Sequence, residues 1–215
     1  IAQLPPVTAN QRKESATITS LLTPARRSPT LLLWTAFFPA FLVVYFVSSW
    51  MPQILTGAGL SQQQAINCTT ALPLGAIVGN LLIGWLASWW RINRLIAAAF
   101  VIGCGCMAAL SALLPGLATM SFALIWSMLF IIGISVLGAF GNLYNVALML
   151  YPVQIRGTGL GWSAGIGRAG AVISPLLAGA LMGAGMSMPA LFLFFAVPGL
   201  IAALCVSLIT MRELP

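Results

Sequence analysis

Acidic residues are almost absent from this chain. It contains nine lysines or arginines but only two acids, Glu14 and Glu213, and it has no aspartate and no histidine. The usual ligand sets of metal sites and a Ser-His-Asp triad are therefore excluded. Neither glutamate lies in an apolar stretch, so no carboxylate pair exists for acid–base catalysis. These absences argue against an enzyme.

Charge of either sign is scarce. Only 5% of the 215 residues are charged and 60% are hydrophobic, whereas soluble domains carry about 25% charged residues. The apolar runs are too long and continuous for the alternating strands of an outer-membrane barrel. The composition predicts an all-α integral membrane protein whose main surroundings are the lipid bilayer.

Two long segments, 28–90 and 95–155, contain no charged residue. Each is about twice the ~20 to 25 residues that cross a bilayer, so each predicts a helical hairpin. A third hairpin, 157–211, contains the single charge of Arg168, and glycine- or proline-containing turns lie at the three expected tips. The six predicted spans are 30–55, 63–87, 95–114, 119–147, 158–183 and 189–211.

The basic residues outside these spans all fall on one side of the predicted membrane. The positive-inside rule places that side, with both termini, in the cytoplasm of a bacterial inner-membrane protein. This distribution explains the net charge of +7 better than nucleic acid does, so no nucleic-acid partner is expected.

Three regions are predicted along the chain. Residues 1–29 are polar, lack the apolar core of a secretory signal and read as a cytoplasmic linker. Residues 30–211 form the six-helix transmembrane domain, and 212–215 form a cytoplasmic tail. Since the chain begins with Ile1, we expect it to be the second part of a longer protein.

Small residues recur at helical spacing in two of the spans. Gly157, Gly161 and Gly165 share one face of the fifth span, and Gly75 and Gly79 share a face of the second. Such faces let another helix approach closely, so packing is expected there rather than ligand contact. Cysteines are expected to be small core residues: Cys68, Cys104, Cys106 and Cys205.

Arg168 lies about ten residues inside the fifth span, near 15 Å deep at roughly 1.5 Å per residue. A charge at that depth costs a few kcal/mol at least, and no span contains an acid to neutralise it. Its partner is expected to be backbone carbonyls, a carboxylate elsewhere or an anionic substrate. The alternative is an arginine that snorkels to the interface.

Two other stripes follow helical spacing. Ser135, Gly138, Asn142 and Asn145 form a polar stripe on the fourth span, which either lines a water-filled path or makes interhelical hydrogen bonds of about 0.6 kcal/mol each.

An aromatic stripe of Trp34, Phe38, Phe41 and Tyr45 lies on the first span. Packing is its simpler explanation, although Tyr45 could stack on a flat ligand. Ser48, Ser49 and Pro52 come next and are expected to break the helix, as in discontinuous transporter helices.

The segment Tyr151-Pro152-Val153-Gln154-Ile155-Arg156-Gly157 resembles the major facilitator superfamily. Its continuation through Gly167-Arg168 to Ser174-Pro175, with Trp34, Tyr45 and Trp50-Met51-Pro52 in the first span, resembles the aromatic acid:proton symporter family. The resemblance covers the whole chain as the carboxyl-terminal half of a twelve-helix transporter, a linker followed by helices seven to twelve.

The resemblance implies roles for two arginines. Arg156 matches the arginine of the loop before helix eleven, with a role in transport or gating, and Arg168 matches the arginine within that helix, near the substrate anion. There are departures from the family pattern. Gly157 stands where alanine is usual, and Ser88 and Trp89 replace the usual Asp and Arg after Gly84-Trp85-Leu86-Ala87, which puts the loop's charge network in doubt.

The implied function is import of a small aromatic carboxylate by proton symport, with alternating access of two six-helix halves. Arg168, Tyr45 and Asn142 are the candidate substrate-binding residues. No cofactor is expected, because the proton gradient supplies the energy. The coupling acid is expected in the missing amino-terminal half, which is the necessary partner.

Three alternatives stay open. The chain could be half of a carrier for another solute such as a sugar, drug or dicarboxylate. It could be a truncated membrane module that does not transport. A self-assembling channel is a third reading, disfavoured because its pore would lack charged rings.

Overall fold

The structure is a computed structural model that describes residues 18–24 and 26–209. Its described part is helical throughout. The elements in chain order are α1 (Ile18–Leu21), α2 (Arg27–Gly57), α3 (Gln62–Thr69), α4 (Ala71–Leu86), α5 (Ile92–Leu113), η1 (Leu114–Thr119), α6 (Phe122–Ile132), η2 (Gly133–Leu137), α7 (Gly138–Leu150), α8 (Arg156–Gly183) and α9 (Met188–Leu208).

Six helical segments are long and apolar enough to cross a membrane, as the spacing of charges predicts. Three of them combine two or three elements: α3 with α4, α5 with η1, and α6 through η2 with α7. The first span begins at Arg27, inside the predicted linker. Residues 1–17 and the predicted tail, 212–215, lie outside the described residues, so the three-region division stays a prediction.

The predicted break near Ser48 and Pro52 is wrong, because α2 runs continuously from Arg27 to Gly57 with Pro39 and Pro52 inside it. A proline removes one amide donor from the helix. The helix continues because the flanking turns keep their own hydrogen bonds and because α2 packs extensively against α8 and α9.

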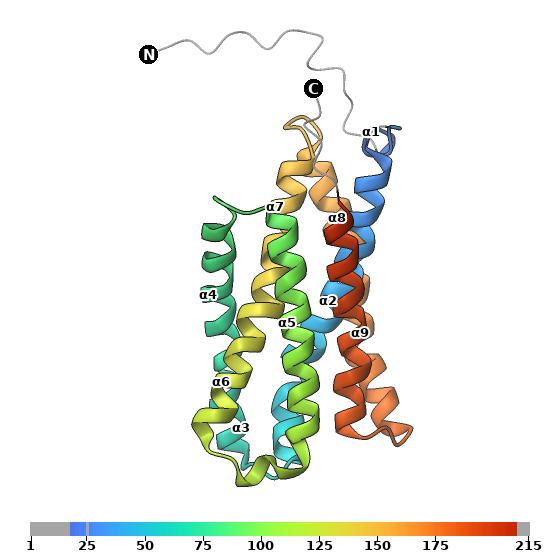
Figure 1. The fold of residues 1–215 in the computed structure, drawn as a ribbon. Coiled ribbons are helices and arrows are strands. Elements are labelled where there is room, and N and C mark those ends of the chain that lie inside the picture. The colour runs from blue at the N-terminus through green and yellow to red at the C-terminus, as the bar shows by residue number, and fades with distance from the viewer. Residues whose placement is uncertain (1–17, 25, 210–215) are drawn as a thin grey trace.

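The six spans alternate in direction. Figure 1 shows the start of α2, the α4–α5 turn, the α7–α8 turn and the end of α9 at one end of the molecule. The α2–α3 turn, η1 and the α8–α9 turn lie at the other end. Gly59 and Gly185 adopt φ values of 100° and 88° in two of the latter turns, a conformation that favours glycine. These turns close the predicted hairpins.

The packing of α2 against α8 depends on residues of α8 that have a small side chain or none. A Cβ added to Gly170 would overlap the backbone oxygen of Phe38, and Ser174 Oγ donates a hydrogen bond of 2.6 Å to the carbonyl of Leu42. The packed face of α8 therefore carries Gly159, Ser163, Gly167, Gly170, Ser174 and Ala178, all buried.

The predicted packing face of α8 is open within the described residues. A Cβ on Gly157, Gly161 or Gly165 would meet no atom within 4 Å, so these glycines contact no other described helix. The prediction of close packing is correct for the second span, where a Cβ on Gly75 or Gly79 would overlap the backbone of α6 or η2. The sequence analysis identified only one small-residue face on α8, and the structure shows that α2 covers a different one.

The fourth span contains a π-helical turn, η2, between α6 and α7. It packs against α4, where the backbones of Gly75, Gly79, Gly133 and Gly138 approach one another. π-turns inside helices often occur at functional sites. Here the turn sets the rotation of α7, which carries several of the residues described next.

Candidate functional site

One side of the bundle, formed by α2, α4, α7 and α8, carries polar side chains that no other described helix covers. We call it the polar face and define it by Asn80, Tyr45, Tyr144, Asn145 and Arg168. Tyr144 is half-buried and the other four are exposed. The open glycine positions of α8 flank it. An uncovered polar surface on membrane-spanning helices indicates a water-filled cavity or another protein segment.

Arg168 lies twelve residues after the start of α8 at Arg156, which places its Cα about 18 Å along the helix. The described residues contain no aspartate or glutamate, and the exposed guanidinium has no ion pair within that part of the chain. Arg168 is therefore far from the end of its span and without an ion pair in the described part of the chain, and its depth in a bilayer stays a prediction.

Two tyrosines lie beside this arginine. The phenol of Tyr144 on α7 lies within electrostatic reach of both Arg168 and Tyr45, so the structure brings α2, α7 and α8 together at this point. Tyr45 is 41% exposed, which leaves its ring partly free to contact a molecule on the polar face.

An aromatic wall supports the two tyrosines. The rings of Phe41 and Tyr45 stack with centroids 5.9 Å apart and planes 17° from parallel. Phe41 also meets Phe140 edge to face at 4.7 Å, and Phe37 meets Tyr144 edge to face at 5.1 Å. Such pairs are worth about 0.5–1.5 kcal/mol each beyond burial, so the wall is stiff.

Gly167, next to Arg168, makes this wall compatible with close packing of α2 and α8. A Cβ at Gly167 would overlap the ring of Phe41. The glycine thus allows the aromatic wall and the guanidinium to occupy adjacent positions on the surface. Together they offer a cation and a flat apolar surface within one site.

Asn142 lies elsewhere. Its side chain is fully buried in the seam between α4 and α7. Its amide nitrogen donates to the carbonyl of Gly138 at 3.0 Å and to Asn80 Oδ1 at 3.4 Å, and its Oδ1 accepts a hydrogen bond of 3.0 Å from Asn145. The structure therefore does not bring Asn142 to the surface that carries Arg168, and substrate contact by Asn142 stays a prediction.

Arg156 lies at the cytoplasm-facing end predicted for α8. Its Nε donates a hydrogen bond of 3.2 Å to the carbonyl of Tyr151. The Tyr151 ring is buried and occupies the space above Gly159, where a Cβ would overlap it. Arg156 thus braces the α7–α8 turn, away from the aromatic wall.

Burial raises the pKa of Tyr151, which lies between two spans, and the neighbouring Thr30, Ser163 and Trp34 side chains offset part of this rise. The hydroxyl lies close to these three groups, yet it makes no geometrically good hydrogen bond to any described residue. A buried phenol of this kind favours its neutral form.

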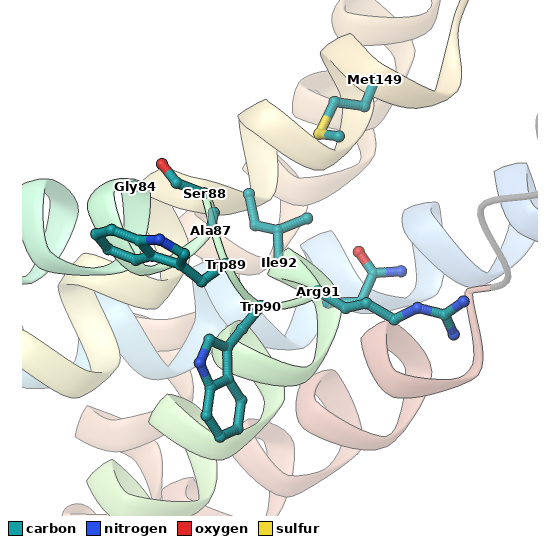
Figure 2. Close-up of a pocket in the computed structure, with 9 residues that line it drawn as sticks. Gly84, Ala87, Ser88, Trp89, Trp90, Arg91, Ile92 and Met149 are labelled. Carbon is teal, nitrogen blue, oxygen red and sulfur yellow. The ribbon is translucent and has the colours of Figure 1, made fainter.

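A separate hollow of about 530 Å³ lies at the α4–α5 turn, lined by residues that include Trp89, Trp90, Arg91 and Met149. Figure 2 shows the two indole rings and the Arg91 guanidinium pointing in three different directions. These side chains do not converge on a common point. We therefore do not assign the substrate site to this hollow.

Six apolar helices long enough to cross a bilayer are the mark of a multi-pass membrane protein. Comparison with known families agrees: the model of the Major Facilitator Superfamily matches residues 2–162. The chain belongs to the Major Facilitator Superfamily, a family of transporters and not of enzymes.

Curated relatives narrow the comparison to one branch. The chain is 34% identical to a gallate transporter of Pseudomonas putida over 180 residues, which cover 84% of this chain and 39% of that protein. It is 32% identical to a 3-(3-hydroxy-phenyl)propionate transporter of Escherichia coli K12 over 207 residues, covering 96% and 50%. A 4-hydroxybenzoate transporter of Acinetobacter baylyi is 28% identical over 177 residues, covering 82% and 38%.

These relatives confirm the predicted resemblance to transporters of aromatic acids. The chain spans half or less of the length of each of the three.

Sequence reasoning missed three of the aromatic residues at this site, Phe37, Phe140 and Tyr144. Phe140 and Tyr144 are four residues apart on one helix face, beside the polar stripe that the sequence did reveal. That spacing could have identified the pair from the sequence. The sequence could not predict that they lie near Arg168, because this proximity depends on how α7 and α8 pack against each other.

Proposed function

We propose that this chain is the carboxyl-terminal half of a secondary transporter that imports small aromatic carboxylates. The observation that carries the proposal is the pairing of Arg168 with an aromatic wall on an uncovered face. The named substrates of the relatives agree with that chemistry. The resemblance to aromatic acid:proton symporters supports symport with protons, with no cofactor.

In this mechanism Arg168 attracts the substrate carboxylate. A guanidinium stays charged at any physiological pH and donates two parallel hydrogen bonds to a planar carboxylate. The ring of the substrate lies against Tyr45 and Tyr144, whose orientation the underlying phenylalanines fix. Low dielectric at this depth strengthens the ion pair relative to water.

Transport requires a second half. The polar face would meet an amino-terminal six-helix half, and rocking of the two halves would expose the site alternately to each side. No carboxylate or imidazole lies in the described spans, so the group that takes up the proton belongs to that second half. Arg156, through its brace on the α7–α8 turn, is proposed to act in gating at the cytoplasmic end.

The orientation follows from the positions of the basic residues. Arg26, Arg27, Arg91, Arg94 and Arg156 all belong to the end of the bundle at which α2 begins and α9 ends. By the positive-inside rule, this distribution supports a bacterial inner-membrane protein whose arginine-rich end faces the cytoplasm.

Replacing Arg168 tests the proposed function. In the complete transporter, Arg168→Gln should lower uptake of labelled 4-hydroxybenzoate at least tenfold, because it removes the only proposed partner of the carboxylate. Arg168→Lys should retain part of the uptake, since it keeps the charge but loses the bidentate geometry.

Arg94→Gln is the matched control, because Arg94 is an exposed arginine in the first turn of α5, and it should leave uptake within twofold. The proposal fails if Arg168→Gln accumulates normally in the membrane and takes up the acid as fast as the unaltered protein.

A further inference from the structure

Three asparagines connect the α4–α7 seam with the polar face. Asn80 Nδ2 donates to the carbonyl of Ala76 at 2.9 Å, Asn142 Nδ2 donates toward Asn80 Oδ1 at 3.4 Å, and Asn145 Nδ2 donates to Asn142 Oδ1 at 3.0 Å. All three amides therefore donate in the same direction along the chain of hydrogen bonds, from Asn145 through Asn142 and Asn80 to the carbonyl of Ala76.

This order fixes which atom each amide presents. The carbonyl of Gly138 can only accept a hydrogen bond, so the Asn142 atom 3.0 Å away from it must be the nitrogen. The Oδ1 of Asn142 is then on its other side and can only accept. Asn145 must meet it with Nδ2, and a flip of either amide would place two like groups against each other.

Asn145 consequently presents its oxygen on the polar face. Its side chain is exposed, and no hydrogen bond joins its Oδ1 to another described residue. Asn142, by contrast, is fully buried and holds Asn145 in place without reaching the surface itself. A fixed acceptor at the surface of a membrane-embedded site selects for a hydrogen-bond donor.

The position of this acceptor complements the cation. Asn145 follows Tyr144, which lies within electrostatic reach of Arg168. Asn145 lies five residues before the end of α7 at Leu150, about 8 Å along the helix, whereas Arg168 lies about 18 Å from the corresponding end of α8. The acceptor and the cation are thus offset along the membrane normal, and Tyr144 lies next to the acceptor on α7 and within electrostatic reach of the cation.

We propose that Asn145 Oδ1 accepts a hydrogen bond from a ring hydroxyl of the substrate, so that the site prefers hydroxylated aromatic acids to unsubstituted ones. The inference rests on the proposed function, since it needs the carboxylate on Arg168 and the ring on the tyrosines. Asn145 is then a specificity-determining residue, and Asn142 and Asn80 are positioning residues.

The test compares two labelled acids, 4-hydroxybenzoate and benzoate, in the complete transporter. Asn145→Leu keeps a similar volume and removes the acceptor. It should raise KM for 4-hydroxybenzoate about five- to tenfold, the worth of one neutral hydrogen bond, and leave KM for benzoate within twofold. Asn145→Ala is a second variant with less bulk and should shift the same ratio.

Asn67→Leu is the matched control, because Asn67 is also an exposed amide but lies on α3, outside the chain of three asparagines. It should leave both KM values unchanged. Equal changes for the two acids in the Asn145 variants, or no change in either, would overturn the inference.

The two proposals fail in different ways. If Arg168→Gln abolishes uptake of both acids while the Asn145 variants keep the normal preference, the proposed function stands and the role of Asn145 is wrong. If the unaltered transporter takes up neither acid, the proposed function is wrong and the inference falls with it.

Discussion

At the scale of single residues, Arg168 and Tyr151 show opposite solutions for a polar group in an apolar protein. The guanidinium of Arg168 lies on an uncovered face, where water or an anion can reach it. Tyr151 is only 1% exposed, and it avoids the cost of a buried charge by remaining neutral. Arg168 is therefore accessible to a binding partner, whereas Tyr151 contributes to the packing of the protein interior.

Tyr151 should make the stability of the protein sensitive to alkali. Its pKa in the folded state is raised above the ordinary value of 10.0 by burial, so folding favours the neutral phenol. This contribution is complete below the ordinary pKa and is lost as the pH rises through the raised one. Thermal unfolding in detergent should therefore show a decline in stability above about pH 10 that Tyr151→Phe diminishes.

The phenylalanine variant keeps the ring over Gly159 and removes only the ionisable group. An equal decline for both proteins would show that another group causes the alkaline instability.

The candidate site was only partly predictable from single residues. The position of Arg168 along its helix follows from counting residues in the sequence. The role of Tyr144 and the orientation of Asn145 depend on contacts with α2, α4 and α8. Those contacts join different helices, for example Asn80 with Asn142 and Phe37 with Tyr144, and a helical period contains no information about them.

At the scale of elements, the two small faces of α8 have different uses. Gly167 and Gly170 admit α2, and Gly157, Gly161 and Gly165 remain open. Both faces satisfy the same spacing rule for close helix approach. Helix α8 therefore has two faces that another helix could approach closely, and α2 covers one of them in the described part of the chain.

Alanine substitutions should distinguish these faces. Gly170→Ala places a methyl group against the backbone oxygen of Phe38, which cannot rotate away, so α2 and α8 must separate. We expect a loss of about 1–3 kcal/mol of stability. Gly165→Ala meets nothing within 4 Å and should be neutral. Thermal unfolding of the purified chain in detergent measures both, and equal losses would contradict the assignment of the faces.

Most of the fold was predictable at this scale, because long uncharged segments in a bilayer can only be helices. The error in the predicted fold concerns the continuity of α2. Ser48, Ser49 and Pro52 have the composition of a helix break, yet α2 continues through them. Neighbouring helices support the chain where one hydrogen bond is missing, and that support is invisible in the sequence of α2 alone.

At the scale of the whole molecule, the orientation in the membrane can be tested by cysteine accessibility. In a variant with its native cysteines replaced, Ala184→Cys in the α8–α9 turn should react with an impermeant maleimide in intact cells. Ser88→Cys and Gln154→Cys, in the α4–α5 and α7–α8 turns, should react only after the membrane is permeabilised, because the positive-inside rule predicts that the turns flanked by arginines face the cytoplasm.

Labelling of Ser88→Cys in intact cells would contradict this orientation, because it would show that the α4–α5 turn, and with it the end of the bundle that carries Arg156, faces outward. The same variants would also show whether the six spans all insert, since a missing span would put consecutive turns on the same side.

The π-turn at Gly133–Leu137 gives the fourth span an unusual evolutionary freedom. Such a turn holds one residue more than the α-helical ladder needs. Because the π-turn absorbs that residue, deleting one codon there should restore a regular ladder and leave α7 with its present rotation, so that Tyr144 and Asn145 keep their places beside α8. The same deletion in the regular part of α7 would turn everything downstream by about 100°. The fourth span can therefore lose one residue at this point alone without reorienting the side chains of the polar face.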